Sequence, residues 1–394
     1  MPTRRSLLLF GACLLFFPFC KGPQRAQPGE APVVETDSIF QHIFENRLAE
    51  VQVQRPKGFA GVEPDQKDQR FSLVPVYYAT DRLPSGKKDP YQFFTGNPNP
   101  WGLQFGKCIV SVPRIHELGE LERPTWWKLE FSEKADRHMV LKEVVPSQEK
   151  DFFHDLRWAG LQADRREALV FIHGFNVSFD EGALRAAQIA YDVSFQGVPI
   201  LYSWPSQGSI VEYFEDGKKN AGTVPNLERF LKKLAREGGF DQIHIVAHSM
   251  GNRALTQALV NLAQEDPGHR LFGQVILAAP DVDAKAFVQD IAPLIYQTAQ
   301  NVTLYASAKD KALLLSKNIN SGPRAGEGGK NLVVVDHIET VDASLIDTDF
   351  LGHNYFANTW LLINDLYYLI NRGWQADRRF LLVEQKDRWR YWFF

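Results

Sequence analysis

A serine placed between small residues is the strongest chemical signal in this sequence. Ser249 lies in the pentapeptide Ala-His-Ser-Met-Gly, with Ala247 two residues before it and Gly251 two residues after it. A short apolar run precedes the pentapeptide, and a run with apolar residues at helical spacing follows it. Strand, sharp turn and helix are the context of a nucleophile elbow, in which small neighbours let strand and helix approach each other. Ser249 is therefore the candidate nucleophile, and Ala247, His248 and Gly251 belong to its supporting turn.

A serine nucleophile needs an oxyanion hole, which backbone N–H groups of two loops could form. One donor is the N–H of the residue after the serine, Met250, and the other comes from an earlier strand-to-helix loop. The run His173-Gly174-Phe175 follows an apolar strand-like segment, and its glycine lets the backbone turn an amide inward. We assign the second donor to Phe175 and expect His173 to support the loop by hydrogen bonding.

An acidic residue and a histidine should follow the serine in that order along the chain. Asp310 comes after the apolar run 302–306 and is the first candidate for the acid. Asp281 and Asp283, after the preceding apolar run, are the alternative acids, and they also fit as a helix cap before residue 284.

His353 is the first candidate for the base, because the base needs a loop long enough to fold back toward the serine. His337 lies closer to the last predicted strand and is the alternative base. Three cysteines are too few for a thiolate zinc site, and Asp281 and Asp283 have no His or Glu partner nearby in sequence. We therefore expect neither a metal nor another cofactor.

Alternating apolar and amphipathic segments must position these residues. Beyond residue 148 the predicted strands are 168–172, 199–202, 243–247, 274–278, 302–306 and 332–335, and the predicted helices are 179–192, 226–237, 253–265, 284–297 and 359–370. Apolar strands separated by amphipathic helices predict an α/β fold, with a mostly parallel central sheet and helices on both faces. Residues 71–148 form a strand-rich N-terminal extension, with predicted strands at 73–78, 107–112 and 126–131.

Three other segments lie between or after these elements. The loop 203–223 carries Trp204, Tyr213 and Phe214, which suit either an acyl chain or packing over the sheet edge. The glycine-rich stretch 322–330 lacks the spacing of a phosphate-binding loop, so we expect a flexible surface loop there. The basic and aromatic C-terminal residues are explained more simply by an edge strand than by a membrane contact.

Length and composition exclude several classes of protein. The chain has 394 residues, of which 44% are hydrophobic, and a formal net charge of -3. This is enough apolar material for a large core, so a disordered chain and a disulfide-stabilised miniprotein are excluded. The near-neutral charge provides no overall field for nucleic acid, and we expect no nucleic-acid partner.

The first twenty residues have the pattern of an export signal. Arg4 and Arg5 precede the apolar run 7–19, which is too short to span a bilayer comfortably. We expect export to the periplasmic side of a bacterial cell envelope. Lipidation at Cys20 is favoured over a free secreted form, although the bulky residue before Cys20 fits a lipidation signal poorly. Membrane association through the N-terminal segment or a lipid anchor follows from this interpretation.

The export signal, the predicted strands and the predicted helices together predict the organisation of the chain. A signal segment at 1–20 and a tether with a short helix at 21–70 precede a single hydrolase domain at 71–394. That domain comprises the strand-rich part at 71–148, a catalytic core at 168–356 and a C-terminal helix and tail at 357–394.

Several blocks of this sequence resemble, in order, a bacterial family of α/β-hydrolases. That family is known mainly as a domain of unknown function and is related to esterases and lipases. The matching blocks are 74–82 (VPVYYATDR), 105–127, 171–179 (FIHGFNVSF), 202–208, 245–255 (IVAHSMGNRAL), 277–283 (LAAPDVD), 305–317 and 351–356 (LGHNYF). The resemblance implies an α/β-hydrolase fold with Ser249, Asp310 and His353 as the triad, and it implies no substrate.

Together these features predict a serine hydrolase that acts on a small-molecule or lipid ester through an acyl-enzyme. One alternative is acyl transfer to an envelope lipid or glycan by the same triad. The other alternative is a non-catalytic scaffold that keeps the fold. The complete set of serine, acid and histidine argues against this alternative.

Overall fold

The computed structural model describes residues 70–123, 133–206, 213–310, 313, 316, 322–346 and 356–394, with only the backbone at 356–359. The export segment, the helix expected in the tether and the strand expected at 126–131 lie outside these residues. Within the described part of the chain, no helix is long and apolar enough to cross a membrane.

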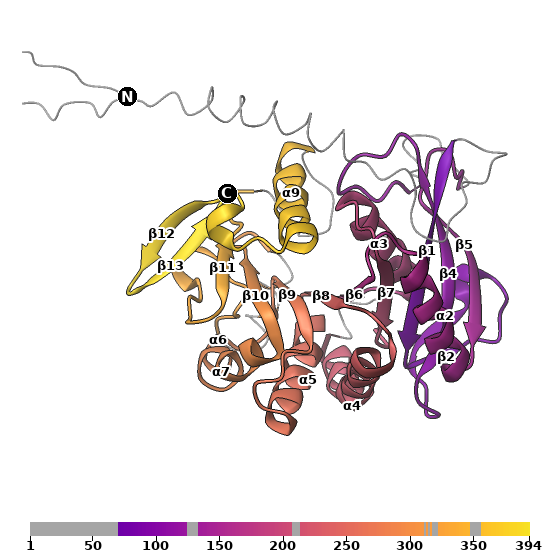
Figure 1. Cartoon of the computed structure of the whole chain (residues 1–394), viewed down its shortest axis with the longest axis horizontal. Helices are drawn as coiled ribbons and strands as arrows, with labels where there is room; N and C mark the ends of the chain where they lie inside the picture. The colour runs from indigo at the N-terminus through magenta and orange to yellow at the C-terminus, as the bar shows by residue number, and fades with distance from the viewer. Residues whose placement is uncertain are drawn as a thin grey trace, which may run out of the picture. The chain divides into compact units, whose positions relative to one another are not determined.

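An eleven-stranded sheet forms the centre of the described chain (Figure 1), with the strand order β12-β13-β11-β10-β9-β8-β6-β7-β1-β4-β5. The strands are Phe71–Thr80 (β1), Gln104–Pro113 (β4), Val140–Ser147 (β5), Glu167–Ile172 (β6), Val198–Ser203 (β7), Gln242–His248 (β8), Phe272–Ala278 (β9), Ala299–Ala306 (β10), Glu339–Asp342 (β11), Leu382–Lys386 (β12) and Trp389–Phe393 (β13). The strands from β11 to β1 in this order pair in parallel, and β4, β5 and β12 pair antiparallel near the two edges. This confirms the expected mostly parallel sheet with added N-terminal strands.

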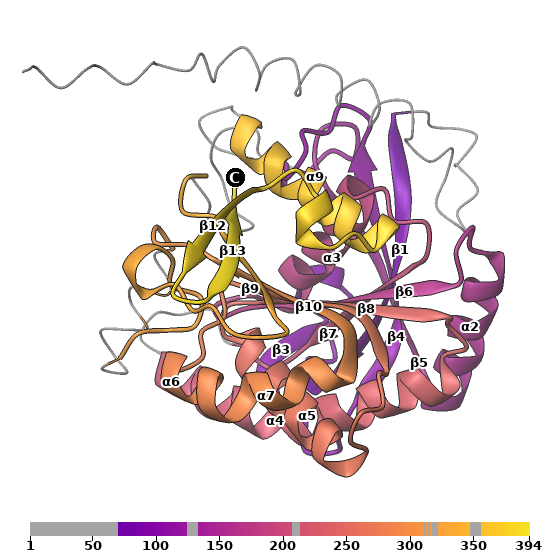
Figure 2. The ribbon, with the colours of Figure 1, turned by 60° about the vertical axis from the view of Figure 1, so that its left-hand side comes forward.

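Helices cover both faces of the sheet, as the apolar strands predict. They are Glu149–Gln162 (α2), Phe179–Asp192 (α3), Tyr213–Glu237 (α4), Gly251–Glu265 (α5), Ala284–Ala286 (α6), Ala292–Ile295 (α7) and Phe356–Arg372 (α9). Figure 2 shows α3 and α9 on one side of the sheet and α4, α5, α6 and α7 on the other. Along β6, Val170 and Ile172 face the core that α4 and α5 cover, whereas Leu169 and Phe171 face the core beneath α3. Each parallel strand is therefore buried on both faces.

A short second sheet extends from the N-terminal strands. It pairs Arg82–Pro84 (β2) with Phe94–Pro98 (β3), directly after β1. Because β1 pairs with β7 in the middle of the main sheet, Arg82 emerges beside the end of β7. The N-terminal extension therefore reaches the carboxyl ends of the central strands.

The strand expected at 332–335 is wrong. Leu332 and Val333 are buried but outside the sheet, and the paired strand is β11, which begins at Glu339. Side chains donate hydrogen bonds to their carbonyl oxygens: Lys386 Nζ donates to Leu332, and Thr340 Oγ1 donates to Val333. An apolar run signals burial, and burial does not require a strand.

The first half of α4 lies where a loop was expected. The stripe that α4 buries in this half consists of Tyr213, Asp216, Asn220 and Thr223, three or four residues apart. Three of these four side chains are polar, so apolar periodicity fails to detect the helix although its spacing is regular.

The glycine-rich stretch 322–330 is not a flexible surface loop. Arg324 and Ala325 are buried, and Gly326 packs so closely on Ala279 that a Cβ would lie 2.4 Å from the Ala279 carbonyl carbon. The Gly326 N–H donates to the Pro280 carbonyl at 3.0 Å. Glycine serves here for close packing against the segment after β9.

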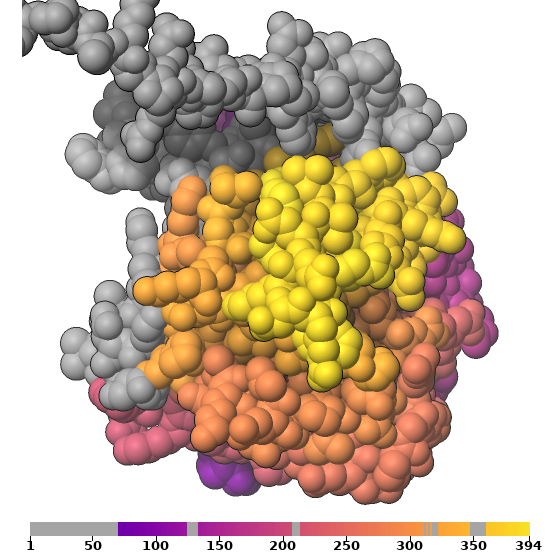
Figure 3. All heavy atoms as spheres, turned by 90° about the vertical axis from the view of Figure 1, so that its left-hand side faces the viewer, coloured from indigo at the N-terminus to yellow at the C-terminus, as the bar shows by residue number. Residues whose placement is uncertain are grey.

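The C-terminal residues form a hairpin at the sheet edge, which confirms the edge strand expected there. β13 pairs in parallel with β11, and β12 pairs with β13 as the outermost strand. In Figure 3, which faces this edge, the C-terminal segment (yellow) lies against the preceding part of the chain (orange).

Candidate active site

Ser249 occupies a strained turn between β8 and α5. Its φ is +48°, a conformation that residues other than glycine seldom adopt. The Ser249 N–H donates to the Ala278 carbonyl at 2.9 Å, which ties the turn to the end of β9. A Cβ at Gly251 would lie 2.4 Å from the His173 carbonyl oxygen, so only glycine lets α5 start this close to the end of β6. Strand, strained serine and close helix form the geometry of a nucleophile elbow.

The side chain of Asn252 holds this turn from within. Its amide nitrogen lies 3.1 Å from the carbonyl oxygens of Ala247 and Ala278 and 3.2 Å from that of Ser249. Asn252 is fully buried. No role was predicted for it, although its place three residues after the serine is visible in the sequence.

The loop after β6 lies directly against Ser249. A Cβ at Gly174 would lie 3.1 Å from Ser249 Cβ and 2.9 Å from His248 Nδ1, so glycine is required for this approach. Neither the Phe175 N–H nor the Met250 N–H donates to a partner among the described residues. These are the two amides that the sequence predicts for an oxyanion hole.

Arg82, for which no role was predicted, is buried beside this loop. Its Nη2 donates to the Val177 carbonyl at 2.6 Å and to His173 Nε2 at 3.2 Å. Its Nη1 donates to the Ser206 carbonyl at 3.0 Å, and its Nε donates to Ser203 Oγ at 2.8 Å. One guanidinium thus joins the loop after β6 to the end of β7.

His173 supports the loop, as expected. It is 1% exposed, and its Nδ1 lies 2.9 Å from the Gly174 carbonyl oxygen. Burial, and then the charge of Arg82, lowers the pKa of His173 to about 3. The ring is therefore neutral at physiological pH.

Asp310 follows β10, two strands beyond the elbow strand. Because β8, β9 and β10 are parallel, their carboxyl ends point the same way. Asp310 and Ser249, which follow two of these strands, therefore both lie at the carboxyl ends of the strands. Asp310 is 5% exposed, and its Oδ1 accepts the Leu313 N–H at 2.8 Å.

Asp281 is committed to two arginines. Arg253 Nη2 and Arg324 Nε each lie 2.8 Å from one of its carboxylate oxygens. Tyr213 and Ser316 also donate to this carboxylate. Burial acts to raise the pKa of Asp281, but Arg253 and Arg324 outweigh it and hold the pKa below its ordinary value. This carboxylate therefore serves as a structural anchor beside the elbow.

Asp283, the other alternative acid, caps α6. Its Oδ1 accepts the Ala286 N–H at 2.9 Å, as the helix-cap interpretation predicts.

The first candidate base, His353, lies outside the described residues. The alternative, His337, is exposed, stacks on Tyr296 with ring centroids 4.5 Å apart, and precedes β11. Because β11 is parallel to the neighbouring strands, residues before it lie at the amino ends of the strands, whereas Ser249 lies at the carboxyl ends. The topology therefore contradicts His337 as the base.

The three aromatic residues expected either to contact an acyl chain or to pack over the sheet edge behave differently. Trp204 is fully buried, stacks on His173 and donates its indole N–H to the His173 carbonyl at 2.8 Å. Of the two roles expected for Trp204, the structure shows packing, because the buried ring offers no surface to a substrate. Tyr213 is 4% exposed and packs on Phe175, whereas Phe214 is 63% exposed. Packing thus accounts for Trp204 and Tyr213.

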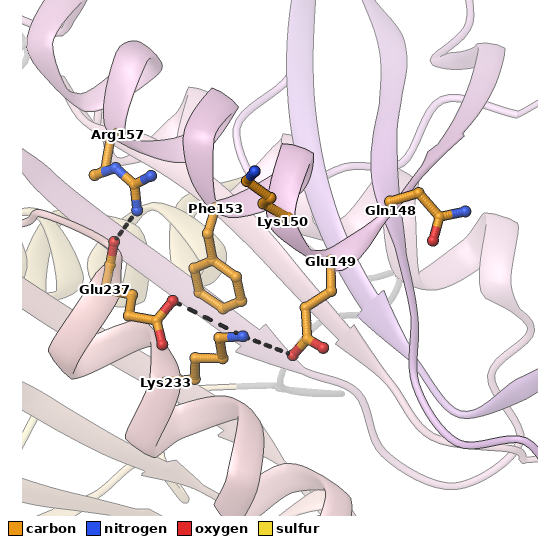
Figure 4. Close-up of a pocket in the computed structure, with 7 residues that line it drawn as sticks. All are labelled: Gln148, Glu149, Lys150, Phe153, Arg157, Lys233 and Glu237. Atoms are coloured by element: carbon orange, nitrogen blue, oxygen red, sulfur yellow. Dashed lines mark hydrogen bonds and ion pairs between the residues drawn. The ribbon is translucent and has the colours of Figure 1, made fainter.

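A groove of about 390 Å³ lies between α2 and α4, away from this site (Figure 4). Lys233 Nζ lies in it 3.2 Å from Glu149 Oε1 and 3.8 Å from Glu237 Oε2, and Arg157 Nη1 donates to the Glu237 backbone carbonyl at 2.9 Å. Lys233 is twenty residues along α4 from Tyr213, a separation of about 30 Å at 1.5 Å per residue. Among the described residues, no group of His, Cys, Asp and Glu could hold a metal ion.

Comparison with known proteins gives a family match. The family described as "Alpha/beta hydrolase of unknown function (DUF900)" matches residues 148–371. None of the curated proteins compared matches the chain.

Solved structures show a weak likeness. A chain from a study of two fungal esterases from Rhizomucor miehei is 10% identical, with a TM-score of 0.34, and the match covers 88% of this chain and 95% of that one. An alpha-beta serine hydrolase homologue from Coxiella burnetii is 15% identical, with a TM-score of 0.28, over 53% of this chain and 85% of that one. Carboxyl esterase 2 from Tuber melanosporum is 11% identical, with a TM-score of 0.32, over 81% and 95%. At these scores the likeness carries no argument about activity.

Proposed function

The chain belongs to the alpha/beta hydrolases of unknown function (DUF900), and from this premise we propose that it is a serine hydrolase of carboxylic esters. The observation that carries the proposal is the strained φ of Ser249, in a turn held against a loop with an available backbone amide. Backbone strain at a buried serine persists only where the surroundings enforce it, and such strain gathers at functional sites.

The proposed reaction proceeds through an acyl-enzyme. His353, oriented by Asp310, takes the proton of the Ser249 hydroxyl as its oxygen attacks the ester carbonyl. The Phe175 and Met250 amides stabilise the tetrahedral oxyanion. The intermediate collapses, the alcohol leaves with the proton from His353, and water attacks the acyl-enzyme by the same sequence.

Labelling with a fluorophosphonate probe tests the nucleophile. We expect the wild-type chain to be labelled and Ser249→Ala to remain unlabelled, with a matched control at another buried serine, Ser111→Ala, that is labelled like the wild type. Equal labelling of wild type and Ser249→Ala would reject Ser249 as the nucleophile. Turnover of p-nitrophenyl esters of increasing acyl length then defines the substrate class.

An added alcohol acceptor distinguishes hydrolysis from the alternative, acyl transfer. A hydrolase releases free acid at a rate that is insensitive to the acceptor, whereas a transferase forms the new ester at the expense of the acid.

Export to the cell envelope is a further part of the proposal, and its support is the N-terminal sequence. A radiolabelled acyl chain should be incorporated into Cys13→Ala but not into Cys20→Ala. Recovery of the whole protein from the cytosol would reject export.

A further inference from the structure

We propose that Arg82 is a positioning residue of the oxyanion hole, which sets the orientation of the Phe175 amide through His173. Arg82 comes from the N-terminal strands, outside residues 148–371, which the family model matches. The inference rests on the proposed serine hydrolase activity and assigns a function to those strands. The proposed role of Arg82 follows from two hydrogen-bond contacts of His173 and one covalent link, taken in order below.

The first contact fixes the tautomer of His173. A guanidinium only donates hydrogen bonds, so His173 Nε2, 3.2 Å from Arg82 Nη2, must be the unprotonated acceptor. The Ser203 hydroxyl, 3.1 Å from the same nitrogen, accepts from Arg82 Nε and is thereby free to donate its own proton to the ring. The ring proton therefore lies on Nδ1.

The second contact uses that proton. Nδ1 lies 2.9 Å from the Gly174 carbonyl oxygen, and a carbonyl only accepts, so the Nδ1 proton must be present for this bond. The requirement at Gly174 and the requirement at Arg82 agree on one tautomer. With the proton on Nε2 instead, Arg82 would meet a donor and the Gly174 carbonyl would meet a lone pair.

The third link is covalent. The Gly174 carbonyl and the Phe175 N–H belong to the same peptide group, and the chain has no cis peptide bond among the described residues. In a trans peptide the carbonyl and the N–H point in opposite directions. The bond from His173 to the carbonyl thus turns the Phe175 N–H away from the ring, on a loop that lies against Ser249.

The other contacts of Arg82 keep this arrangement rigid. Arg82 also donates to the carbonyl of Val177, at the far end of the loop, and Ser206 Oγ accepts the Asn176 N–H at 2.9 Å. Trp204 stacks on His173 and holds the His173 carbonyl. Burial lowers the pKa of Arg82 to about 10, with Asp81 and Asp216 opposing the shift, so the guanidinium is charged at neutral pH.

The test compares Arg82→Met and Arg82→Lys with Arg379→Met in ester hydrolysis. Arg379 is also a buried arginine, paired with Asp365 of α9 and Glu339 of β11, and its loss should reduce stability while leaving kcat unchanged. Arg82→Met should lower kcat by about tenfold to a hundredfold with little change in KM, approaching the loss of one oxyanion donor. Arg82→Lys should lie between Arg82→Met and the wild type. If Arg82→Met retains the wild-type kcat, or loses no more than Arg379→Met, the proposal is rejected.

A second pair of variants tests the His173 step and covers the case in which Arg82→Met fails to fold. His173→Asn keeps an N–H on the atom bonded to Cγ, where Nδ1 was, and His173→Leu does not. Asn should retain clearly more kcat than Leu, and equal loss in both would reject the proposal.

A readout independent of activity is the ring ¹⁵N spectrum of His173, assigned by its absence in His173→Asn. The wild type should show the Nδ1–H tautomer, and Arg82→Met, which has no donor to hold Nε2 unprotonated, should show Nε2–H as well. An unchanged tautomer would overturn the inference. If instead the wild type neither hydrolyses esters nor reacts with a fluorophosphonate while the tautomer shifts, it is the proposed function that fails.

Discussion

The side-chain amide nitrogen of Asn252 lies 3.2 Å from the carbonyl oxygen of Ser249, the residue with the strained φ of +48°. The same nitrogen lies 3.1 Å from the carbonyls of Ala247 and Ala278, on the elbow strand and its neighbour. One buried amide thus joins the end of β8, the turn at Ser249 and the end of β9, and the strained turn cannot relax without breaking these bonds.

Replacement of Asn252 by leucine should therefore loosen the elbow. Loss of the donor leaves buried carbonyls short of a partner, which costs about 1–3 kcal/mol in the free energy of unfolding. Urea denaturation measures that loss, and the rate of fluorophosphonate labelling should fall in parallel. Asn261→Leu, on the same helix with a bond to Glu228, is the control and should change neither by a comparable amount. Wild-type labelling in Asn252→Leu would contradict this role.

Gly174→Ala should damage activity more than stability. The added methyl group would lie 2.9 Å from His248 Nδ1 and 3.1 Å from Ser249 Cβ, so the loop must move away from the nucleophile. We expect kcat/KM to fall at least tenfold, since a displaced oxyanion donor costs about 10²–10³ in kcat when lost completely.

Gly222→Ala is the matched control for this variant. Gly222 lies in α4 with open space where its Cβ would be, so alanine there should raise stability by about 0.5–1 kcal/mol and leave kcat/KM unchanged. Steady-state kinetics and thermal unfolding of both variants separate the two effects. A Gly174→Ala variant as active as Gly222→Ala would show that the loop is not near the reacting atoms.

The acid can be identified by a pair of variants with opposite signatures. Asp310→Asn should lower kcat by about 10³- to 10⁴-fold, because a triad acid fixes the tautomer of the base, and should change stability little. Asp281→Asn should instead lower the free energy of unfolding by about 3 kcal/mol or more, because it leaves Arg253 and Arg324 short of a counter-charge. Full activity in Asp310→Asn would shift the acid to Asp281 or Asp283.

His116 should make stability depend on pH. Its side chain is 2% exposed, with Nδ1 2.7 Å from Glu122 Oε1 and Nε2 2.6 Å from Asp192 Oδ1. Burial acts to lower the pKa of His116, but Asp192 and Glu122 outweigh it and raise the pKa from 6.5 to about 10. A raised pKa in the folded state stabilises the fold fully below 6.5, and this contribution is lost as the pH rises through 10.

His116→Gln removes this contribution. The difference in unfolding free energy between wild type and His116→Gln should be largest near pH 6 and should shrink steadily toward pH 10. Urea denaturation at pH 6, 8 and 10 measures it. A difference that grows with pH would show that His116 is neutral in the folded protein.

The sequence by itself determined the elbow and the parallel sheet. Strand, small residues, serine and helix are contiguous in residues 242–265, so local periodicity and side-chain volume are sufficient to predict them. The order of serine and acid along the chain, together with a parallel sheet, also predicts that Ser249 and Asp310 both lie at the carboxyl ends of the strands. These features depend on neighbours in sequence or on the direction of successive strands.

Tertiary structure alone decided which side chains support that turn. Arg82 and His173 are 91 residues apart, and they meet because β1 is inserted beside β7, a pairing that no local pattern encodes. The buried stripe in the first half of α4 is polar, so it resembles a surface until the partners of those side chains are known. Asp281 and Asp310 each follow a predicted strand in the sequence, and only the structure shows that two arginines pair with Asp281. Each of these decisions depends on which distant groups share a buried site, because burial and charge act through space rather than along the chain.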